Sequence, residues 1–302
     1  MKLTILGCYA ATPRTLTNPT SQVLELNNEL FLIDCGEGTQ VELRRNKVKF
    51  SKIKHVFISH LHGDHFFGLI GLISTFMLLG RETELHIYGP KGIKEIITLQ
   101  LKMSKSWTSY PLYFHELTGR EPEVILETKK VTVETIPLDH RVYTNGFLFR
   151  EKPGDRKLLM EEVEKYPIDV AYYRGIKKGK DAVLDDGTVI PNELLTADPE
   201  PPLSYAFCSD TAYKPEIASQ LKNVSVLYHE ATFLEEHAYL AAPTKHSTAK
   251  EAAAIARSAS VSKLILGHFS TRYDSILPFK EEAKEIFPEV ELAEDGKNFS
   301  FY

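Results

Sequence analysis

The sequence predicts an α+β protein in which two β-sheets pack face to face, helices cover their outer sides, and a polar arm interrupts the chain. Short apolar strands followed by helical segments occur twice along the 302 residues, before and after a polar stretch at residues 151–202. That repeated order is typical of two sheet layers with helices outside. A hydrophobic content of 43% and a charged content of 25% indicate a globular chain with a large core and exclude global disorder.

The first half opens with strands. We expect one at residues 2–7 and a hairpin of 21–26 with 30–33, because Asn27 and Asn28 tolerate the positive φ of a tight turn. The apolar stretch 66–79 lacks strict alternation and is too long for a strand, so it predicts a buried helix. The other expected elements of this half are strands 56–59, 85–88, 123–126, 131–136 and 147–150 and a helix at 91–105.

The second half repeats the pattern. Apolar runs at 205–208, 224–228 and 264–266 predict strands. Thr248 with Glu251 three residues later forms a capping-box pattern, which predicts that a helix over 248–259 begins there. A helix at 281–287 and two short strands end the chain.

The stretch between the halves has a different composition. Residues 151–202 are rich in Lys, Asp, Gly and Pro, contain one short helical pattern at 158–166, and offer little that could form a core. We therefore expect a single domain over residues 1–302, with an arm at 152–196 inserted into it and without a core of its own.

Charge, cysteine usage and hydropathy limit the partners. A net charge of −5 argues against a uniformly basic surface but permits a local basic patch. The three cysteines, Cys8, Cys35 and Cys208, have no C-x-x-C spacing, which argues against a disulfide framework and favours a reducing, cytoplasmic location. The longest apolar run, 66–80, is shorter than the ~20 residues that cross a bilayer, so we expect no membrane partner.

The strongest local pattern is a cluster of metal-binding side chains. His60, His62, Asp64 and His65 lie within six positions, directly after a predicted strand and before a predicted helix. Imidazole and carboxylate ligands without thiolate suit zinc, with manganese and iron as less selective alternatives. A polar loop with incidental histidines is the simpler interpretation, but four such groups at this spacing favour a metal site.

Three more candidates, His140, Asp210 and His268, each follow a predicted strand, as a site at one rim of a sheet sandwich requires. The count favours two ions, one bound by His60, His62 and His140 and the other by Asp64, His65 and His268, with Asp210 shared. Two Zn²⁺ ions about 3.5–4 Å apart lower the pKa of a water and clamp phosphate oxygens. Individually, the three residues could instead be a surface histidine, a turn residue and a core histidine.

The His60-x-His62-x-Asp64-His65 pattern resembles the signature of the metallo-β-lactamase superfamily. That resemblance implies an αββα four-layer sandwich. It leaves the reaction open, because lactonases, thioesterases and nucleases share the signature.

Later motifs resemble those of the ribonuclease Z family, endonucleases that mature tRNA 3′ ends. The matching segments are Leu32 to Gln40, Ser209 to Thr211, His229 to Phe233, His246 to Thr248 and Gly267 to Tyr273. The resemblance implies a zinc-dependent enzyme that cuts precursor tRNA after the discriminator nucleotide, leaving a 3′-hydroxyl tRNA and a 5′-phosphate trailer. It also implies a homodimer.

The resemblance marks Asp64 as the proton acceptor and His246 with Glu230 as a pair near the scissile phosphate. Independently, His246 precedes the capped helix, whose free N–H groups favour a phosphate. Glu230 would orient His246 as a phosphate clamp or as the acid for the leaving oxygen, unless it is a surface carboxylate at a strand end. Asp34 either holds a ligand histidine from outside the metal cluster or is a turn residue before Gly36.

The arm contains Arg174, Lys177, Lys178 and Lys180 around two glycines, where the resemblance implies a grip on the tRNA elbow. Phosphate contacts of this kind position RNA without reading its sequence, although composition alone also fits a solvated loop. The chain departs from the family in the arm at Val170-Ala171, where many bacterial members have Gly-Pro. In an early loop, Thr15 and Thr17 stand where basic residues are usual. The sequence therefore leaves open whether the protein rejects tRNA that already ends in CCA. Arg14 is the nearby basic residue that could replace the missing ones.

Two rival functions remain at this stage. A phosphodiesterase or lactonase acting on a small molecule would share the metal site but would have no use for a basic arm. An RNA-binding protein with a structural metal would usually close the ion with four protein ligands, often cysteines.

Overall fold

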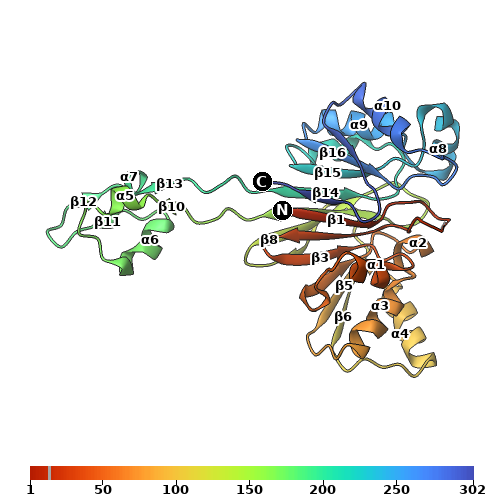
Figure 1. The fold of residues 1–302 in the computed structure, drawn as a ribbon, viewed down its shortest axis with the longest axis horizontal. Helices are drawn as coiled ribbons and strands as arrows, with labels where there is room; N and C mark the ends of the chain where they lie inside the picture. Colours follow the sequence, from red (N-terminus) through yellow and green to blue (C-terminus); the bar gives the residue numbers. More distant parts are fainter. Residues whose placement is uncertain (13–14) are drawn as a thin grey trace. The chain divides into compact units, whose positions relative to one another are not determined.

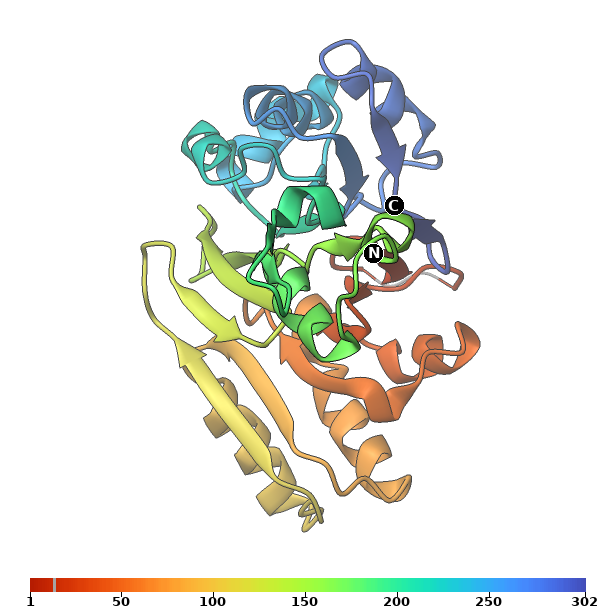
Figure 2. The ribbon, with the colours of Figure 1, turned by 90° about the vertical axis from the view of Figure 1, so that its left-hand side faces the viewer.

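The computed structural model describes residues 1–12 and 15–302, which form two compact units. The larger unit contains Met1–Arg150 and Leu203–Tyr302, and the smaller contains Glu151–Pro202. In the larger unit two seven-stranded sheets face each other between two layers of helices (Figures 1 and 2). The predicted four-layer α+β sandwich is confirmed.

The first sheet has the strand order β18-β1-β2-β3-β4-β5-β6. Its strands are β1 (Lys2–Gly7), β2 (Ser21–Leu26), β3 (Glu29–Ile33), β4 (Ile53–Phe57), β5 (Leu85–Pro90), β6 (Leu112–Leu117) and β18 (Asn298–Ser300). The expected hairpin joins β2 to β3, and Asn27 and Asn28 have φ of 52° and 65°. From β3 to β6 the strands are parallel, so their carboxyl ends lie at one edge.

The second sheet has the order β17-β16-β15-β14-β9-β8-β7. Its strands are β7 (Val124–Glu127), β8 (Val131–Pro137), β9 (Asn145–Glu151), β14 (Ser204–Cys208), β15 (Val226–Glu230), β16 (Lys263–Gly267) and β17 (Val290–Leu292). Strands β14 to β17 are parallel, and β14 pairs antiparallel with β9. Because side chains alternate along a strand, one face of each sheet is apolar and meets the other sheet.

Helices cover the outer faces. Against the first sheet lie α1 (Thr39–Arg45), α2 (Gly63–Phe66), α3 (Leu69–Leu78) and α4 (Ile93–Met103). Against the second lie α9 (Ala249–Ser258) and α10 (Leu277–Lys284), and α8 (Ala238–Thr244) precedes α9 in the chain. The capping box that predicted the start of α9 is present, since Thr248 accepts from the Glu251 N–H and Glu251 accepts from the Thr248 N–H. Between the sheets, the ring of Phe57 stacks on that of Tyr88, with ring centroids 4.8 Å apart. Its centroid lies 5.3 Å from that of Phe147.

The predicted helix over 66–79 is divided into α2 and α3 near Gly68. The Gly68 N–H donates to Cys35 O (2.9 Å), and the Cys35 N–H donates to His65 O (2.7 Å). A Cβ on Gly68 would lie 2.0 Å from the carbonyl oxygen of Gly36. This close backbone approach, which only glycine allows, fixes the loop that carries His60 to His65 against the loop after β3.

The smaller unit has a core, which corrects the expectation that the arm has none. It contains α5 (Met160–Val163), α6 (Tyr173–Lys177), α7 (Asn192–Leu195) and two strand pairs, β10 (Lys157–Leu158) with β13 (Thr196–Ala197) and β11 (Ala182–Val183) with β12 (Val189–Ile190). Val163, Ile176 and Leu195 are buried together. Asn192 donates from Nδ2 to the carbonyls of Ile176 and Lys180. Isolated apolar residues in a polar sequence meet because these short elements fold back on one another.

Other differences are local. Strand β6 was not expected, because Leu112 to Leu117 is an edge strand of mixed polarity. Helix α10 begins four residues earlier than expected, with Pro278 near its start, where the missing N–H of proline costs no hydrogen bond. Within residues 1–12 and 15–302, no helix combines the length and the apolar character that a membrane span needs. Short 3₁₀ turns occur at Phe50–Lys52, Val170–Tyr172, Pro215–Ser219 and Glu235–His237.

Replacing Gly68 by Ala should destabilise the larger unit. The added Cβ forces the backbone at Gly36 apart, and such overpacking costs about 1–3 kcal/mol of the free energy of unfolding. Thermal unfolding should shift downward by about 2–4 °C for each kcal/mol. Gly154→Ala is the matched control, because its Cβ would meet only Pro199 Cβ at 3.7 Å, and an unchanged Tm of Gly68→Ala would contradict the close approach.

Candidate metal centre

The seven side chains predicted to bind metal meet at one rim of the larger unit. His60 and His62 follow β4, and Asp64 and His65 lie in α2. His140 follows β8, Asp210 follows β14, and His268 follows β16. Their ligand atoms gather in two groups, each within 4.8 Å: His60, His62, His140 and Asp210 in one, and Asp64, His65 and His268 in the other.

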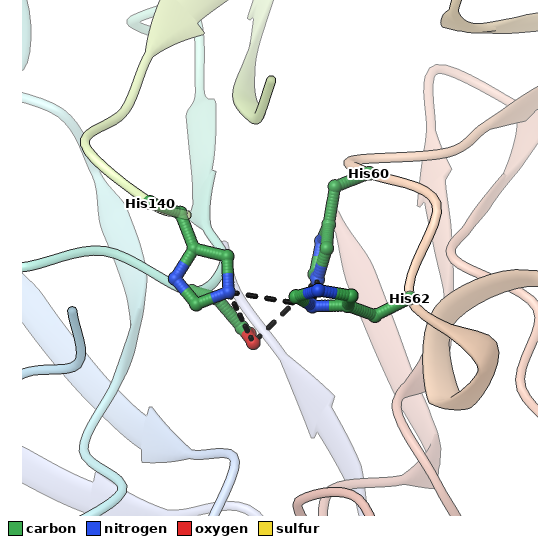
Figure 3. Close-up of side chains that lie close together, drawn as sticks. His60, His62 and His140 are labelled. Carbon is green, nitrogen blue, oxygen red and sulfur yellow. Dashed lines mark hydrogen bonds and ion pairs between the residues drawn. The ribbon is translucent and has the colours of Figure 1, made fainter. Parts of the chain in front are cut away.

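The first group brings three imidazoles and one carboxylate together. In Figure 3 the rings of His60, His62 and His140 point toward one another from the loops after β4 and β8. His62 Nδ1 lies 3.0 Å from His60 Nε2 and 3.3 Å from His140 Nε2. Asp210 Oδ2 lies 3.6 Å from His60 Nε2 and 3.8 Å from His140 Nε2.

The second group lies on the other side of Asp210. Asp64 Oδ2 is 3.5 Å from His65 Nε2 and 3.7 Å from His268 Nε2. Asp210 Oδ1 is 3.4 Å from His65 Nε2 and 3.2 Å from His268 Nε2. Asp210 therefore turns one carboxylate oxygen toward each group.

Two imidazoles of the centre are oriented by oxygens that can only accept a hydrogen bond. His65 Nδ1–H donates to Asp34 Oδ2 (2.7 Å), and His140 Nδ1–H donates to the carbonyl of Lys245 (2.8 Å). With the proton on Nδ1, the lone pair on Nε2 faces the centre. Hydrogen bonds of this kind fix the tautomer and raise the basicity of a metal ligand.

His60 and His268 are oriented through hydroxyl groups. Ser59 Oγ–H donates to Asp34 Oδ2, so Ser59 Oγ accepts from His60 Nδ1–H at 3.0 Å. Thr232 Oγ1–H donates to Glu230 Oε2, so Thr232 Oγ1 accepts from His268 Nδ1–H at 2.9 Å. Four imidazoles thus present Nε2 inward.

The donor set fits a pair of divalent cations. His65 Nε2 and His268 Nε2 are buried and have no hydrogen-bond partner. Asp34, Asp210 and Glu230 are buried as well, and the ion pairs that these carboxylates form within the described residues involve histidines alone. Buried carboxylates without Lys or Arg need positive charge from another source, which metal ions supply.

The pKa values of His65 and Asp210 also show that the buried carboxylates favour positive charge beside them. Burial disfavours the charged form of His65, but the Asp210, Asp34 and Asp64 carboxylates outweigh burial and hold its pKa well above the ordinary value. Burial also opposes ionisation of Asp210, yet His268, His65 and His60 lower its pKa. For His60, burial dominates and keeps the pKa well below the ordinary value, so it stays a neutral ligand.

His246 and Glu230 form a pair beside the metal cluster. His246 Nδ1–H donates to Glu230 Oε1 (2.9 Å), and Glu230 also accepts from the backbone N–H groups of Thr211 and Thr232. Burial lowers the pKa of His246, but the adjacent Glu230 carboxylate outweighs it and raises the pKa to about 9. His246 is within 4.8 Å of ligand atoms of Asp210 and His268, so it reaches the cluster.

Some groups that hold the candidate ligands in place could not be identified from the sequence, and others could. The Ala11 N–H donates to Asp64 Oδ2 (2.8 Å), and the Lys245 carbonyl holds His140, yet backbone groups occur at every residue. Ser59 and Thr232 could have been found, because each lies beside a predicted site residue. Asp34 is buried with φ of 54° and accepts from the Ser59 N–H and His65, which is the geometry of a supporting residue.

The structure describes the early loop in part and all four of the predicted arm cations. Thr15 and Thr17 lie in the described part of the chain, whereas Pro13 and Arg14 lie outside it. Arg174 and Lys177 belong to α6 and Lys178 ends it, and these three side chains and Lys180 are exposed. None of the four forms an ion pair with another described residue, so their charges are available to a ligand.

Fold and site together define a metal-dependent hydrolase of the metallo-β-lactamase fold. The family model described as "Anti-Pycsar protein Apyc1" matches residues 1–161, which include strands β1 to β6 of the first sheet and the His60 to His65 cluster, and so places the chain among the proteins that share this pattern. The structure of metallo-β-lactamase fold protein YhfI from Bacillus subtilis has a TM-score of 0.68 at 20% identity, covering 99% of this chain and 98% of that chain.

Closer relatives identify the family. A curated protein of Bacteroides fragilis named Ribonuclease Z is 48% identical over 295 residues, which are 98% of this chain and 97% of that protein. The structure of human tRNase Z, short form, has a TM-score of 0.72 at 25% identity and covers 99% of each chain. The chain belongs to the ribonuclease Z family, which confirms the predicted family and enzyme class.

Replacing Asp34 by Asn should weaken metal binding. The amide lacks the negative charge that holds His65 and supports its basicity, and losing such a partner typically costs about 10–100-fold in metal affinity. Competition against a chromophoric chelator measures this affinity. Glu42→Gln, which also removes a buried carboxylate but lies in α1, should leave the affinity unchanged, and equal effects of both variants would refute the role of Asp34.

Proposed function

We propose that this chain is a zinc-dependent endoribonuclease that removes 3′ trailers from precursor tRNA. It cuts after the discriminator nucleotide and leaves a tRNA with a 3′-hydroxyl and a trailer with a 5′-phosphate. Membership of the ribonuclease Z family supports the substrate. The observation that carries the mechanism is the position of Asp210, with one oxygen toward each ligand group.

Two Zn²⁺ ions fit the ligands. His60, His62 and His140 would hold one ion, Asp64, His65 and His268 the other, and Asp210 both. When bound, such a pair lowers the pKa of a water and neutralises the oxygens of a phosphate. Imidazole and carboxylate ligands favour zinc, and metal analysis of the purified protein distinguishes it from manganese and iron.

The residues around the ligands handle the protons. Asp64 is placed to accept the proton that the attacking water gives up. The Ala11 N–H, 2.8 Å from Asp64 Oδ2, fixes the position of this carboxylate. Because water is the nucleophile, the 2′-hydroxyl takes no part. The water oxygen forms the new bond to phosphorus as the P–O3′ bond breaks, so the phosphate stays on the trailer and O3′ leaves with the tRNA.

His246 serves the leaving group. Glu230 occupies Nδ1 and keeps the imidazole protonated, with the pKa raised to about 9 against the effect of burial, so Nε2–H is available. From there it donates a proton to the O3′ that departs with the tRNA, or a hydrogen bond to the phosphate. Such assistance contributes about 10²–10⁴-fold in rate.

The arm, assembly and location complete the proposal. Arg174, Lys177, Lys178 and Lys180 would contact tRNA phosphates, which adds affinity without sequence specificity. The resemblance to the family supports a homodimer in which the arm of one protomer presents tRNA to its partner. Three free, buried cysteines suit the cytoplasm.

A labelled precursor tRNA tests this function. The metal-loaded protein should release a tRNA that ends in a 3′-hydroxyl directly after the discriminator nucleotide. Excess chelator should abolish cleavage, and added Zn²⁺ should restore it. Mapping the product ends on precursors with and without an encoded CCA measures both the cut position and the effect of Thr15 and Thr17.

Asp64→Ala separates an enzyme from an RNA-binding protein. It should retain precursor binding in a gel-shift assay while turnover is lost. Undiminished cutting in excess chelator, or ends elsewhere on the RNA, would refute the proposed reaction. Hydrolysis of bis-p-nitrophenyl phosphate without any cleavage of precursor tRNA would favour a small-molecule phosphodiesterase.

Neutralising the arm should weaken tRNA cleavage selectively. With Arg174, Lys177, Lys178 and Lys180 all changed to Gln, the KM for precursor tRNA should rise about tenfold or more at low salt. The dependence of log KM on log salt should flatten by about one for each lost phosphate contact. Hydrolysis of bis-p-nitrophenyl phosphate, which lacks the tRNA elbow that the arm is proposed to grip, should not change.

The matched control removes the same charge elsewhere. Lys94, Lys102, Arg257 and Lys284 are exposed on helices of the larger unit, and changing all four to Gln should leave the KM unchanged. If both quadruple variants behave alike, net charge and not the arm governs tRNA binding.

A further inference from the structure

A groove of about 680 Å³ adjoins the metal centre at His140. Its lining includes the loop from Pro137 to Asn145 together with Tyr213, Lys214 and Lys245. This volume is in the range of sites that hold ligands of nucleotide size. The inference drawn from the groove rests on the proposed function, because it concerns the RNA strand beside the scissile bond.

The free charge in the groove is mainly positive. Lys245 Nζ pairs with Asp139 (2.6 Å), and Lys214 Nζ donates to the carbonyl of Pro137 (2.7 Å). Arg120 and Arg141 also line the groove, and neither has a hydrogen-bond or ion-pair partner among the described residues. Glu216 is the lining carboxylate that lacks an ion-pair partner in the same set. Two unpaired guanidinium groups suit phosphate, which they can bind through paired N–H donors.

Arg141 lies at the metal end of the groove. It follows His140 directly in the chain, and both residues line the groove. A phosphate next to the scissile one lies within a nucleotide's length of the metal centre, so this guanidinium is placed for that contact.

The groove also offers an aromatic surface on a rigid wall. Tyr213 is 44% exposed, and its ring is available for stacking. In the same lining, Tyr143 Oη–H donates to the carbonyl of Gly119 (2.7 Å) and accepts from Asn145 Nδ2 (2.9 Å), which holds this part of the groove in place. Stacking a base on an aromatic side chain contributes about 1–3 kcal/mol and is tolerant of sequence.

The position of His246 indicates whether the groove binds RNA on the tRNA side or on the trailer side of the scissile bond. The rings of His140 and His246 are 5.1 Å apart, and Lys245 joins the groove to His246 in the chain. In the proposed reaction His246 faces the departing O3′, which belongs to the tRNA. The groove therefore opens on the tRNA side of the scissile bond. We propose that it binds the last nucleotide retained on the tRNA, with Arg141 on the phosphate 5′ to that nucleotide and Tyr213 against its base.

Product analogues test this assignment. The dinucleoside phosphate ApA, with a free 3′-hydroxyl, represents the tRNA end. The dinucleotide pUpU, with its 3′-hydroxyl methylated, represents the trailer. Each is measured as an inhibitor of bis-p-nitrophenyl phosphate hydrolysis by the zinc-loaded protein. Arg141→Ala and Tyr213→Ala should each raise the inhibition constant of ApA about tenfold and leave that of blocked pUpU unchanged, since one phosphate contact or one stacked base is lost.

Conservative variants and a control complete the experiment. Tyr213→Phe keeps the ring and should behave as the wild type, and Arg257→Ala removes an exposed charge in α9 and should leave both constants unchanged. A selective loss of pUpU inhibition would assign the groove to the trailer and overturn the proposal. Unchanged constants in both alanine variants, or no inhibition of the wild type by ApA, would also overturn it. The proposed function is judged separately, by whether the wild type cuts precursor tRNA at all.

Discussion

The structure depends on a concentration of negative charge that the protein cannot neutralise alone. Asp34, Asp210 and Glu230 are buried at one rim, Asp64 is nearly so, and the ion pairs among them involve imidazoles. Burying carboxylates in this way is expensive unless cations compensate. Divalent ions bound at the two groups would satisfy this requirement, so the same concentration of negative charge that costs folding free energy would give the site its affinity for metal.

The fold meets this requirement by directing strand ends to one place. β4, β14, β15 and β16 all end at the rim, and each delivers a carboxylate or an imidazole there within a few residues of its last hydrogen bond. Two turns at this rim are unusual: Asp34, directly after β3, and His268, directly after β16, have φ of 54° and 59°, a conformation that costs about 1–3 kcal/mol for such residues. The hydrogen bonds from His65 and Ser59 to Asp34, and from His268 to Thr232, hold these turns in position.

The sequence predicted the elements whose signal is local. Four candidate side chains in six positions, and three more directly after apolar runs, were enough to predict which side chains gather in the two groups. Their role as metal ligands, and the sharing of Asp210 between two ions, stay predictions. The supporting contacts were harder to foresee, since the Lys245 carbonyl and the Ala11 N–H are backbone groups. The core of the smaller unit was missed because Val163, Ile176 and Leu195 lie far apart in a polar stretch and meet only after folding. The assignment of Asp34 stayed open because a buried supporting residue and a turn residue look alike in one sequence.

The turn at Lys245 and His246 links His140 of the first group to the pair of His246 and Glu230. The carbonyl of Lys245 accepts from His140, and the next residue, His246, donates to Glu230. Lys245 has φ of 55° and ψ of 55°, so the chain turns sharply between these two contacts. Glu230 is tied in turn through Thr232 to His268, a ligand of the second group. A shift of His246 would therefore strain residues of both groups, through Lys245 to His140 and through Glu230 and Thr232 to His268. Lys245 also pairs with Asp139 in the groove, so the nucleotide proposed to bind there would contact the same turn.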